Sequence, residues 1–338
     1  MMDPSAFLMN VLGDQTYNKF LFEDDYYIEK ESSNVDEATL TYRIVNGHVG
    51  TIIDAFICYF VSVFGVCMIS DIANAMGTFK SRYKELYIGS GEEEDFLRRR
   101  LRTLRMNGYL MGIVCNYGKA QGKEDSEASV MLYTARRPAI ALIRNTLQRT
   151  VNCNDTLYTR HAYELSGHTL ASCSASRCMS NPNFVDFLPN KHNFNTNFGQ
   201  FYVPVELYFK RSDVKYYVGF WYCYWVFDKR IHTDRSYKDY TMKMASSVML
   251  FLNYRTHRNA DGIAESVIVV RDMEELKTFV SYILKVDYEN ALPHLYFTSE
   301  SILNRNFDIT DSFLSVKLDE SKPEGFTFIQ KEPEFLLK

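Results

Sequence analysis

The chain has 338 residues, of which 46% are hydrophobic, 15% aromatic and 24% charged. This composition excludes a disordered or low-complexity polypeptide and predicts a folded protein with two domains. The net charge of −4 excludes a polycation, so any surface that binds nucleic acid has to be local.

Several further classes of protein are excluded by simple features. The first ten residues lack the basic and apolar regions of a signal peptide. The most apolar stretch, 52–72, is interrupted by Asp54 and Asp71, which predicts a buried helix rather than a membrane span. The seven cysteines form no CxxC pair and no zinc pattern. We therefore expect reduced thiols in a cytoplasmic protein, without a metal or a cofactor.

Residues 1–50 are predicted to form an acidic N-terminal arm. They contain nine Asp or Glu and three Lys or Arg, a net charge of −6. Within the arm, residues 38–47 predict a short strand that ends in an Asn-Gly turn.

Residues 51–149 show an ordered series of elements. Apolar side chains at helical spacing predict a first helix that Gly65 ends, and a second, short helix from 68 to 77, capped by Ser70 or Asp71 and stopped by Gly77. A third helix over 92–107, ended by Gly108, is followed by strands at 109–115 and 129–135 and by a closing helix that begins near Pro138. Helix, helix, helix, hairpin, helix is the order of a winged helix.

The third helix carries five arginines in eight residues, 98–105. Leu97, Leu101 and Leu104 fall at i, i+4 and i+7, one stripe that is predicted to face inward. Residues 78–149 hold 14 basic and 8 acidic side chains, a net charge of +6 inside an acidic protein. This pattern predicts a surface that binds double-stranded DNA. The predicted groove contacts are Arg98, Arg99, Arg102 and Arg105, and the predicted phosphate contacts are Lys119, Lys123 and Arg136.

Two other interpretations stay open for this region. The arginines can form an ordinary solvated face with i,i+4 pairs to preceding acids. A winged helix can also serve only as a protein-interaction module, in which the acidic arm could occupy the basic face. The long connection between the second and third helices, and the acids Glu124, Asp125 and Glu127 in the hairpin turn, count against DNA binding.

The segments LRRRLRTLRMNGYL (97–110) and LYTARRPA (132–139) resemble the replication-relaxation group of winged-helix proteins, which occur on plasmids and integrative mobile elements. Tyr109-Leu110 and the Leu-Tyr-Thr step at 132–134 match the pattern of that group. The resemblance covers roughly residues 51 to 305. It implies a second domain that resembles the PD-(D/E)XK nuclease core in a degenerate form.

Residues 150–330 independently predict an α/β sandwich with a mixed sheet, so the whole chain is assigned to the α+β class. A helix over 161–178 precedes aromatic-rich strands at 198–209 and 214–227. A helix over 236–255 is followed by a strand, a helix and a strand between 265 and 301. Residues 331–338 are predicted to be a tail.

A nuclease of this type needs two carboxylates on adjacent strands to hold Mg²⁺, with a lysine nearby. Glu206 could supply the first carboxylate, but the next strand offers residues 219–223, Gly-Phe-Trp-Tyr-Cys, and no acid before Asp228. Lys229 and Lys243 are available, and Asp186 is a spare acid. We therefore predict no catalytic residue, and a metal-dependent nuclease remains the alternative.

The leading hypothesis is a non-enzymatic protein that binds double-stranded DNA in replication, transfer or transcription control on a mobile element. The protein is also expected to bind a second copy of the chain or replication and transfer proteins. It is not expected to bind a membrane.

Overall fold

The computed structural model divides into two compact units, residues 1–165 and 166–338, and both mix helices and strands. No helix among the described residues has the length and hydropathy that crossing a bilayer requires. The strand predicted at 38–47 lies outside the described residues. The structure describes residues 26–28, 51–80, 82, 86, 93–116, 129–151, 162–188, 203–223, 234–258, 262–270, 273–285, 289–299, 302–303, 306 and 308–337.

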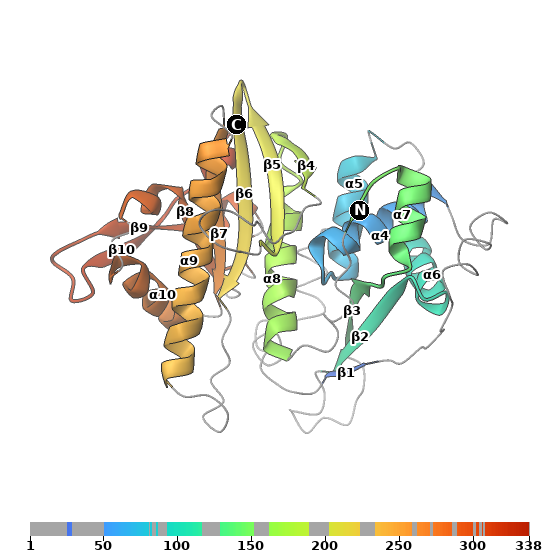
Figure 1. Ribbon diagram of the computed structural model, residues 1–338, viewed down its shortest axis with the longest axis horizontal. Helices are drawn as coiled ribbons and strands as arrows, with labels where there is room; N and C mark the ends of the chain where they lie inside the picture. Colours follow the sequence, from blue (N-terminus) through green and yellow to red (C-terminus); the bar gives the residue numbers. More distant parts are fainter. Residues whose placement is uncertain are drawn as a thin grey trace. The chain divides into compact units, whose positions relative to one another are not determined.

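The first unit contains helices and a small antiparallel sheet in the order that the sequence predicts for 51–149 (Figure 1). α7 packs against α4, and α6 packs against α5 and β2. The elements are β1 (Tyr26–Ile28), α4 (Ile52–Phe64), α5 (Ile69–Phe79), α6 (Glu93–Met106), β2 (Leu110–Asn116), β3 (Ser129–Ala135) and α7 (Ala139–Leu147).

The ends of α4 and α5 follow local side-chain chemistry. α4 begins with a capping box between Thr51 and Asp54, and it ends at Gly65, whose φ of 84° suits a residue without a side chain. At the start of α5, the carboxylate of Asp71 accepts a hydrogen bond from the Met68 backbone N–H. The prediction that Gly77 stops this helix is wrong, because α5 continues through Gly77 to Phe79. A glycine inside a helix weakens the helix without ending it when both flanks are packed.

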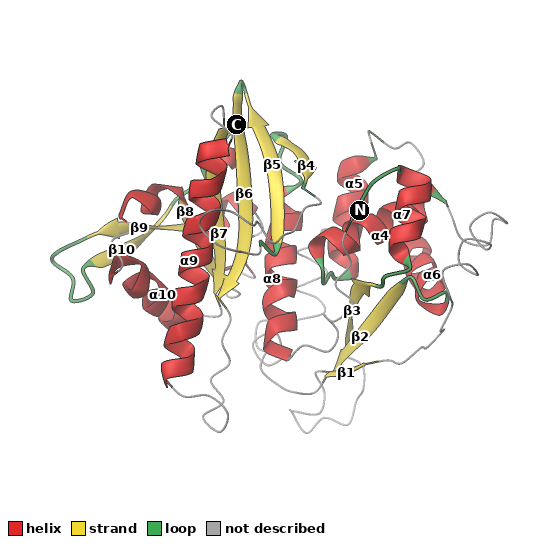
Figure 2. Cartoon of the chain, in the orientation of Figure 1, coloured by secondary structure: helices red, strands yellow, loops and turns green. Residues whose placement is uncertain are grey.

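The small sheet has the order β1-β2-β3 (Figure 2). β2 and β3 form the predicted hairpin, with Leu110 opposite Ala135 at its base. β1 comes from the acidic arm and pairs antiparallel with β2, an element that the sequence did not predict. Between α4 and α5, Cys67 forms a single bridge to Tyr133 of β3. The chain between the first two helices therefore joins the sheet on the side of β3, and the arm joins it on the side of β2.

The second unit is built on a seven-stranded mixed sheet of order β10-β9-β8-β7-β6-β5-β4. β6, β7 and β8 run parallel in the centre, and the flanking pairs are antiparallel. The elements are α8 (Ala162–Cys178), β4 (Phe184–Phe187), β5 (Val205–Arg211), β6 (Val214–Cys223), α9 (Asp234–Arg258), β7 (Gly262–Val270), α10 (Met273–Lys285), β8 (Leu295–Ser299), β9 (Leu314–Leu318), β10 (Phe326–Gln330) and the 3-10 helices η4 (Glu289–His294), η5 (Ile309–Ser312) and η6 (Glu334–Leu336).

Adjacent side chains of β6 show how this sheet is covered on both faces. Trp221 belongs to the core formed with α9 and α10, and its indole packs edge-on against Phe251 of α9. Tyr222 points to the other face, where its ring lies 4.7 Å from that of His168 in α8. The close approach of α8 to Tyr222 occurs at Gly167, where a Cβ would lie 2.3 Å from the ring. The predicted mixed sheet between helices is confirmed.

The C-terminal residues dock on the face of the sheet that α8 covers. The ring of Phe335 in η6 is buried 4.7 Å from that of Phe209 and 6.2 Å from that of Tyr296. The Asn181 side-chain amide donates to the Leu336 carbonyl, and the Asn183 amide donates to the carbonyls of Phe335 and Leu337. The segment predicted as a tail is therefore part of the packed unit.

Candidate nucleic-acid interface

The candidate interface is centred on α6, whose orientation is fixed by its leucines. Leu97, Leu101 and Leu104 are at most 2% exposed, as the predicted inward stripe requires. Tyr109, just after the helix, is also buried, and its backbone N–H donates to the Leu104 carbonyl. Because one side of α6 is held in the core, the side chains on the opposite side have to face outward.

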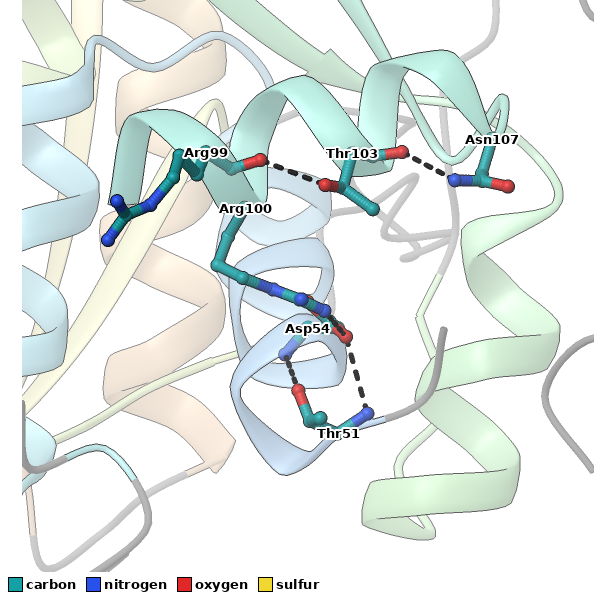
Figure 3. Close-up of polar contacts among 6 residues, drawn as sticks. All are labelled: Thr51, Asp54, Arg99, Arg100, Thr103 and Asn107. Atoms are coloured by element: carbon teal, nitrogen blue, oxygen red, sulfur yellow. Dashed lines mark hydrogen bonds and ion pairs between the residues drawn. The ribbon is translucent and has the colours of Figure 1, made fainter. Parts of the chain in front are cut away.

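Arg100 lies beside the leucine stripe and ties α6 to α4 (Figure 3). Its Nε donates to Asp54 Oδ1 at 2.9 Å, and its Nη2 donates to Asp54 Oδ2. Asp54 is fully buried, and its Oδ2 also accepts the Thr51 backbone N–H that opens α4. A fork of this kind satisfies both carboxylate oxygens, so a buried charge is compensated and the rotation of α6 about its own axis is fixed.

The prediction that Arg105 contacts the DNA groove is corrected, because its side chain is buried in the first unit. It is 9% exposed, and its Nη1 lies 2.9 Å from the Met131 sulfur on β3. The guanidinium lies over Gly112 of β2, where a Cβ would come within 2.7 Å of Nε. Arg105 thus fastens the end of α6 to the hairpin and is not available to a base or a phosphate.

The remaining arginines of α6 are oriented outward. Arg98, Arg99 and Arg102 are exposed, and we call these three residues the arginine stripe. They fall at i, i+1 and i+4 and so share one side of the helix, opposite the leucines. Figure 3 shows the Arg99 side chain extending away from the helix, whereas Arg100 reaches toward Asp54. Three of the four predicted groove residues are therefore placed where an external partner can reach them.

Two polar side chains near the end of α6 are engaged with the helix backbone (Figure 3). Thr103 Oγ1 donates to the Arg99 carbonyl at 2.9 Å, and Asn107 Nδ2 donates to the Thr103 carbonyl at 2.8 Å. The Asn107 amide thus adds a second donor to the Thr103 carbonyl, which also accepts the Asn107 backbone N–H. Met106, beside them, is 58% exposed. Sequence patterns do not single out Met106, because one methionine among arginines forms no repeat.

The predicted phosphate contacts have different outcomes. Arg136 is half-buried directly after β3, and its backbone N–H donates to the Tyr109 carbonyl at the base of the hairpin. Lys119 and Lys123 lie outside the described residues. Among the predicted phosphate contacts, Arg136 is therefore the one that the described structure places near α6.

In the second unit, the carboxylate proposed for metal binding faces a cation instead. Glu206 of β5 is 3% exposed, and its Oε1 lies 2.5 Å from Nη2 of Arg255 in α9. The Arg255 guanidinium also lies over the ring of Tyr217, 5.1 Å from its centroid. Burial raises the pKa of Glu206 despite the opposing effect of Arg255. This arrangement neutralises the carboxylate internally.

The strand beside Glu206 has no room for a second carboxylate. Gly219 of β6 lies directly opposite Glu206, and a Cβ there would come within 2.8 Å of the Trp221 indole nitrogen and 3.0 Å of the Phe251 ring. Within the described residues no group of three His, Cys, Asp or Glu is placed to hold a metal ion. Asp186 is half-buried and accepts the Phe187 backbone N–H, Lys243 is exposed on α9, and Asp228 and Lys229 lie outside the described residues.

Four of the predicted thiols can be placed. Cys58, Cys67, Cys173 and Cys178 are buried, in agreement with the prediction of buried thiols. Burial raises the pKa of the Cys178 thiol far above its ordinary value, so that group stays protonated at neutral pH.

Comparisons with protein-family models, with curated proteins and with solved structures found no match.

Proposed function

We propose that the chain binds double-stranded DNA through the first unit, in which α6 acts as the recognition helix of a winged helix. The observation that carries this proposal is the arginine stripe, three exposed guanidinium groups on a helix whose orientation Arg100 and Arg105 fix from within. Arginine forks fit guanine edges and phosphates, and a rigid presentation lowers the entropy lost on binding.

The order of the sheet supports a winged helix. Strands β2 and β3 directly follow α6, and the bridge between Cys67 and Tyr133 adds the chain between the first two helices to the sheet. A hairpin adjacent to a recognition helix is positioned to contact the phosphate backbone beside the groove. In this proposal the second unit is a degenerate nuclease-like scaffold with no catalytic role, because Glu206 pairs with Arg255 and Gly219 leaves no space for its partner. The proposed role of the protein in replication, transfer or transcription control on a mobile element rests on the sequence resemblance.

The proposal is tested by comparing two arginines in the first unit. Arg102→Ala removes an exposed charge from α6, and Arg144→Ala removes an exposed charge from α7 as a matched control. In gel-shift titrations with duplex DNA, Arg102→Ala should weaken binding by about 1–3 kcal/mol if Arg102 reads a base. Arg144→Ala should have a much smaller effect. Equal affinity of wild type and Arg102→Ala, or an equal loss in both variants, would refute the proposed role of the stripe.

Salt dependence gives a second, independent measurement. The logarithm of the binding constant should fall linearly with the logarithm of salt concentration, by about 0.9 for each phosphate contacted. Wild-type affinity that does not change between low and high salt would exclude binding through phosphates.

A further inference from the structure

The exposed side of α6 presents few kinds of chemical group. Among the residues of α6 whose side chains are described, 95–106, it carries Asp95 and Met106 beyond the arginine stripe. The polar side chains of Thr103 and Asn107 donate to the helix backbone, Arg100 is paired with Asp54, and Arg105 is buried. The set of groups that α6 offers to an external surface is therefore narrower than its sequence indicates.

Met106 lies in line with the arginine stripe. It falls at i+4 from Arg102 and at i+7 from Arg99, so all three share one side of the helix. Along the axis Met106 is ~6 Å from Arg102 and ~10 Å from Arg99, because an α-helix rises about 1.5 Å per residue. With 58% of its surface exposed, it is the most exposed large hydrophobic side chain in the described part of the chain. An apolar contact point thus follows directly after the cationic ones.

The base edges of the major groove differ in what these groups can contact. Arginine forms two hydrogen bonds with guanine, and asparagine or glutamine does so with adenine. The thymine methyl group is an apolar feature of the groove, and it suits a flexible, polarisable thioether. α6 itself contains no Asn or Gln, and the Asn107 amide nitrogen that follows it donates to the Thr103 carbonyl. Met106, in contrast, offers a partner to the thymine methyl.

We propose that α6 reads guanines through the arginine stripe and a neighbouring thymine methyl group through Met106. The preferred DNA would then place a thymine about two base steps from the guanine that Arg102 contacts, judged from the ~6 Å between the two residues along the helix. This inference rests on the proposed function, and it adds which bases the helix distinguishes. A lone exposed methionine can also be an ordinary surface residue, and the test separates the two cases.

The test removes only the methyl group from the DNA. Two short duplexes are compared by fluorescence anisotropy. One has repeating GGTT on one strand and AACC on the other, so that every guanine has a thymine two base steps away, and the second has deoxyuridine in place of every thymine. Wild type should bind the thymine duplex about fourfold more tightly, the ratio expected from burying one methyl group. Met106→Leu should keep this preference, and Met106→Ala should bind both duplexes equally.

Two controls make the outcome specific. Met242→Ala truncates an exposed methionine of α9, 46% exposed, and should keep the full preference for thymine. Arg102→Ala should weaken binding to both duplexes by the same factor. Equal binding of both duplexes by wild type, or a preference that survives in Met106→Ala, would overturn the reading of thymine and leave DNA binding intact. If wild type binds neither duplex, the proposed function fails and this inference fails with it.

Discussion

Glu265 on β7 allows a quantitative prediction about the stability of the second unit. The residue is 1% exposed, and the Tyr296 hydroxyl donates to its Oε1 at 3.2 Å. Burial and the nearby Glu334 raise its pKa from an ordinary 4.5 to about 8, although hydrogen bonds from Tyr296 and the Phe335 backbone and the charge of Lys331 act against this. A ten-fold change in proton affinity, one pKa unit, corresponds to ~1.4 kcal/mol. The rise from 4.5 to about 8 therefore means that ionising Glu265 at high pH costs the folded state about 5 kcal/mol.

The direction of the pH effect follows from proton linkage. Because the folded state holds the proton more tightly than the unfolded state, the contribution of Glu265 is fully present below about pH 4.5 and is lost as the pH rises toward 8. Glu265→Gln keeps a neutral side chain of the same shape at every pH. The variant should therefore match wild type near pH 4.5 and become more stable than wild type by several kcal/mol near pH 8.

Urea unfolding followed by tryptophan fluorescence measures this difference. Both tryptophans, Trp221 and Trp225, lie within residues 166–338, so the signal reports on the second unit. The difference in unfolding free energy between variant and wild type should grow steadily between pH 4.5 and 8. A difference that stays constant over this range, or one in which wild type is the more stable protein at pH 8, would refute a protonated Glu265.

Three further perturbations follow from the first unit. Asp54→Ala leaves the Arg100 guanidinium without its buried carboxylate and should destabilise the first unit by about 3–5 kcal/mol, measured by thermal unfolding; an unchanged melting temperature would contradict the proposed anchoring role. Arg105→Ala should lower the free energy of unfolding by about 1–3 kcal/mol, with little change in the DNA affinity of the folded protein. Arg102→Ala should have the opposite pattern. A loss of DNA affinity in Arg105→Ala without a loss of stability would show that Arg105 contacts the groove. Residues 1–25 carry five acidic side chains and one lysine, and deleting them keeps β1. The deletion should tighten duplex binding at low salt but not at high salt, because salt screens the repulsion between these acids and DNA. Equal binding of the full chain and the deletion variant at low salt would show that the arm does not oppose DNA.

The element order of both units was largely predictable, because it depends on periodicity. The leucine stripe of α6 and the apolar face of α4 repeat at helical spacing, and the aromatic runs of β5 and β6 are long enough to identify as strands. Sequence patterns did not predict the strands β4, β9 and β10, which have four or five residues each. LSVKL and FTFIQ are short and partly polar, and they become strands because the edge of an existing sheet supplies their hydrogen-bond partners.

The roles of individual arginines were less predictable, because they depend on residues far away in the sequence. By helical position, Arg105 lies next to Arg98 on α6, and on the helix alone both belong to one basic surface. The hairpin distinguishes them, because Gly112 has no side chain that would collide with the Arg105 guanidinium, and the Met131 sulfur supplies a contact for it. Helical periodicity alone cannot show this, since Gly112 and Met131 become neighbours of Arg105 only when β2 and β3 pair.

Three buried acids, one in the first unit and two in the second, share one sequence feature, a carboxylate inside an apolar run. Asp54 lies in IIDAFICYF, Glu206 in VPVELYF and Glu265 in AESVIVV, and all three are buried. Each has a different partner: Arg100 for Asp54, Arg255 for Glu206, and the Tyr296 hydroxyl for Glu265. Two-metal or one-metal hydrolysis needs carboxylates that converge on one point and remain ionised there. Asp54 and Glu206 each have an arginine as counter-ion, burial holds Glu265 protonated at neutral pH, and the three acids do not share a partner on which they could converge. In the described part of this chain, these acids within apolar runs are internal anchors, and the exposed arginine stripe of α6 is the surface that we propose for DNA.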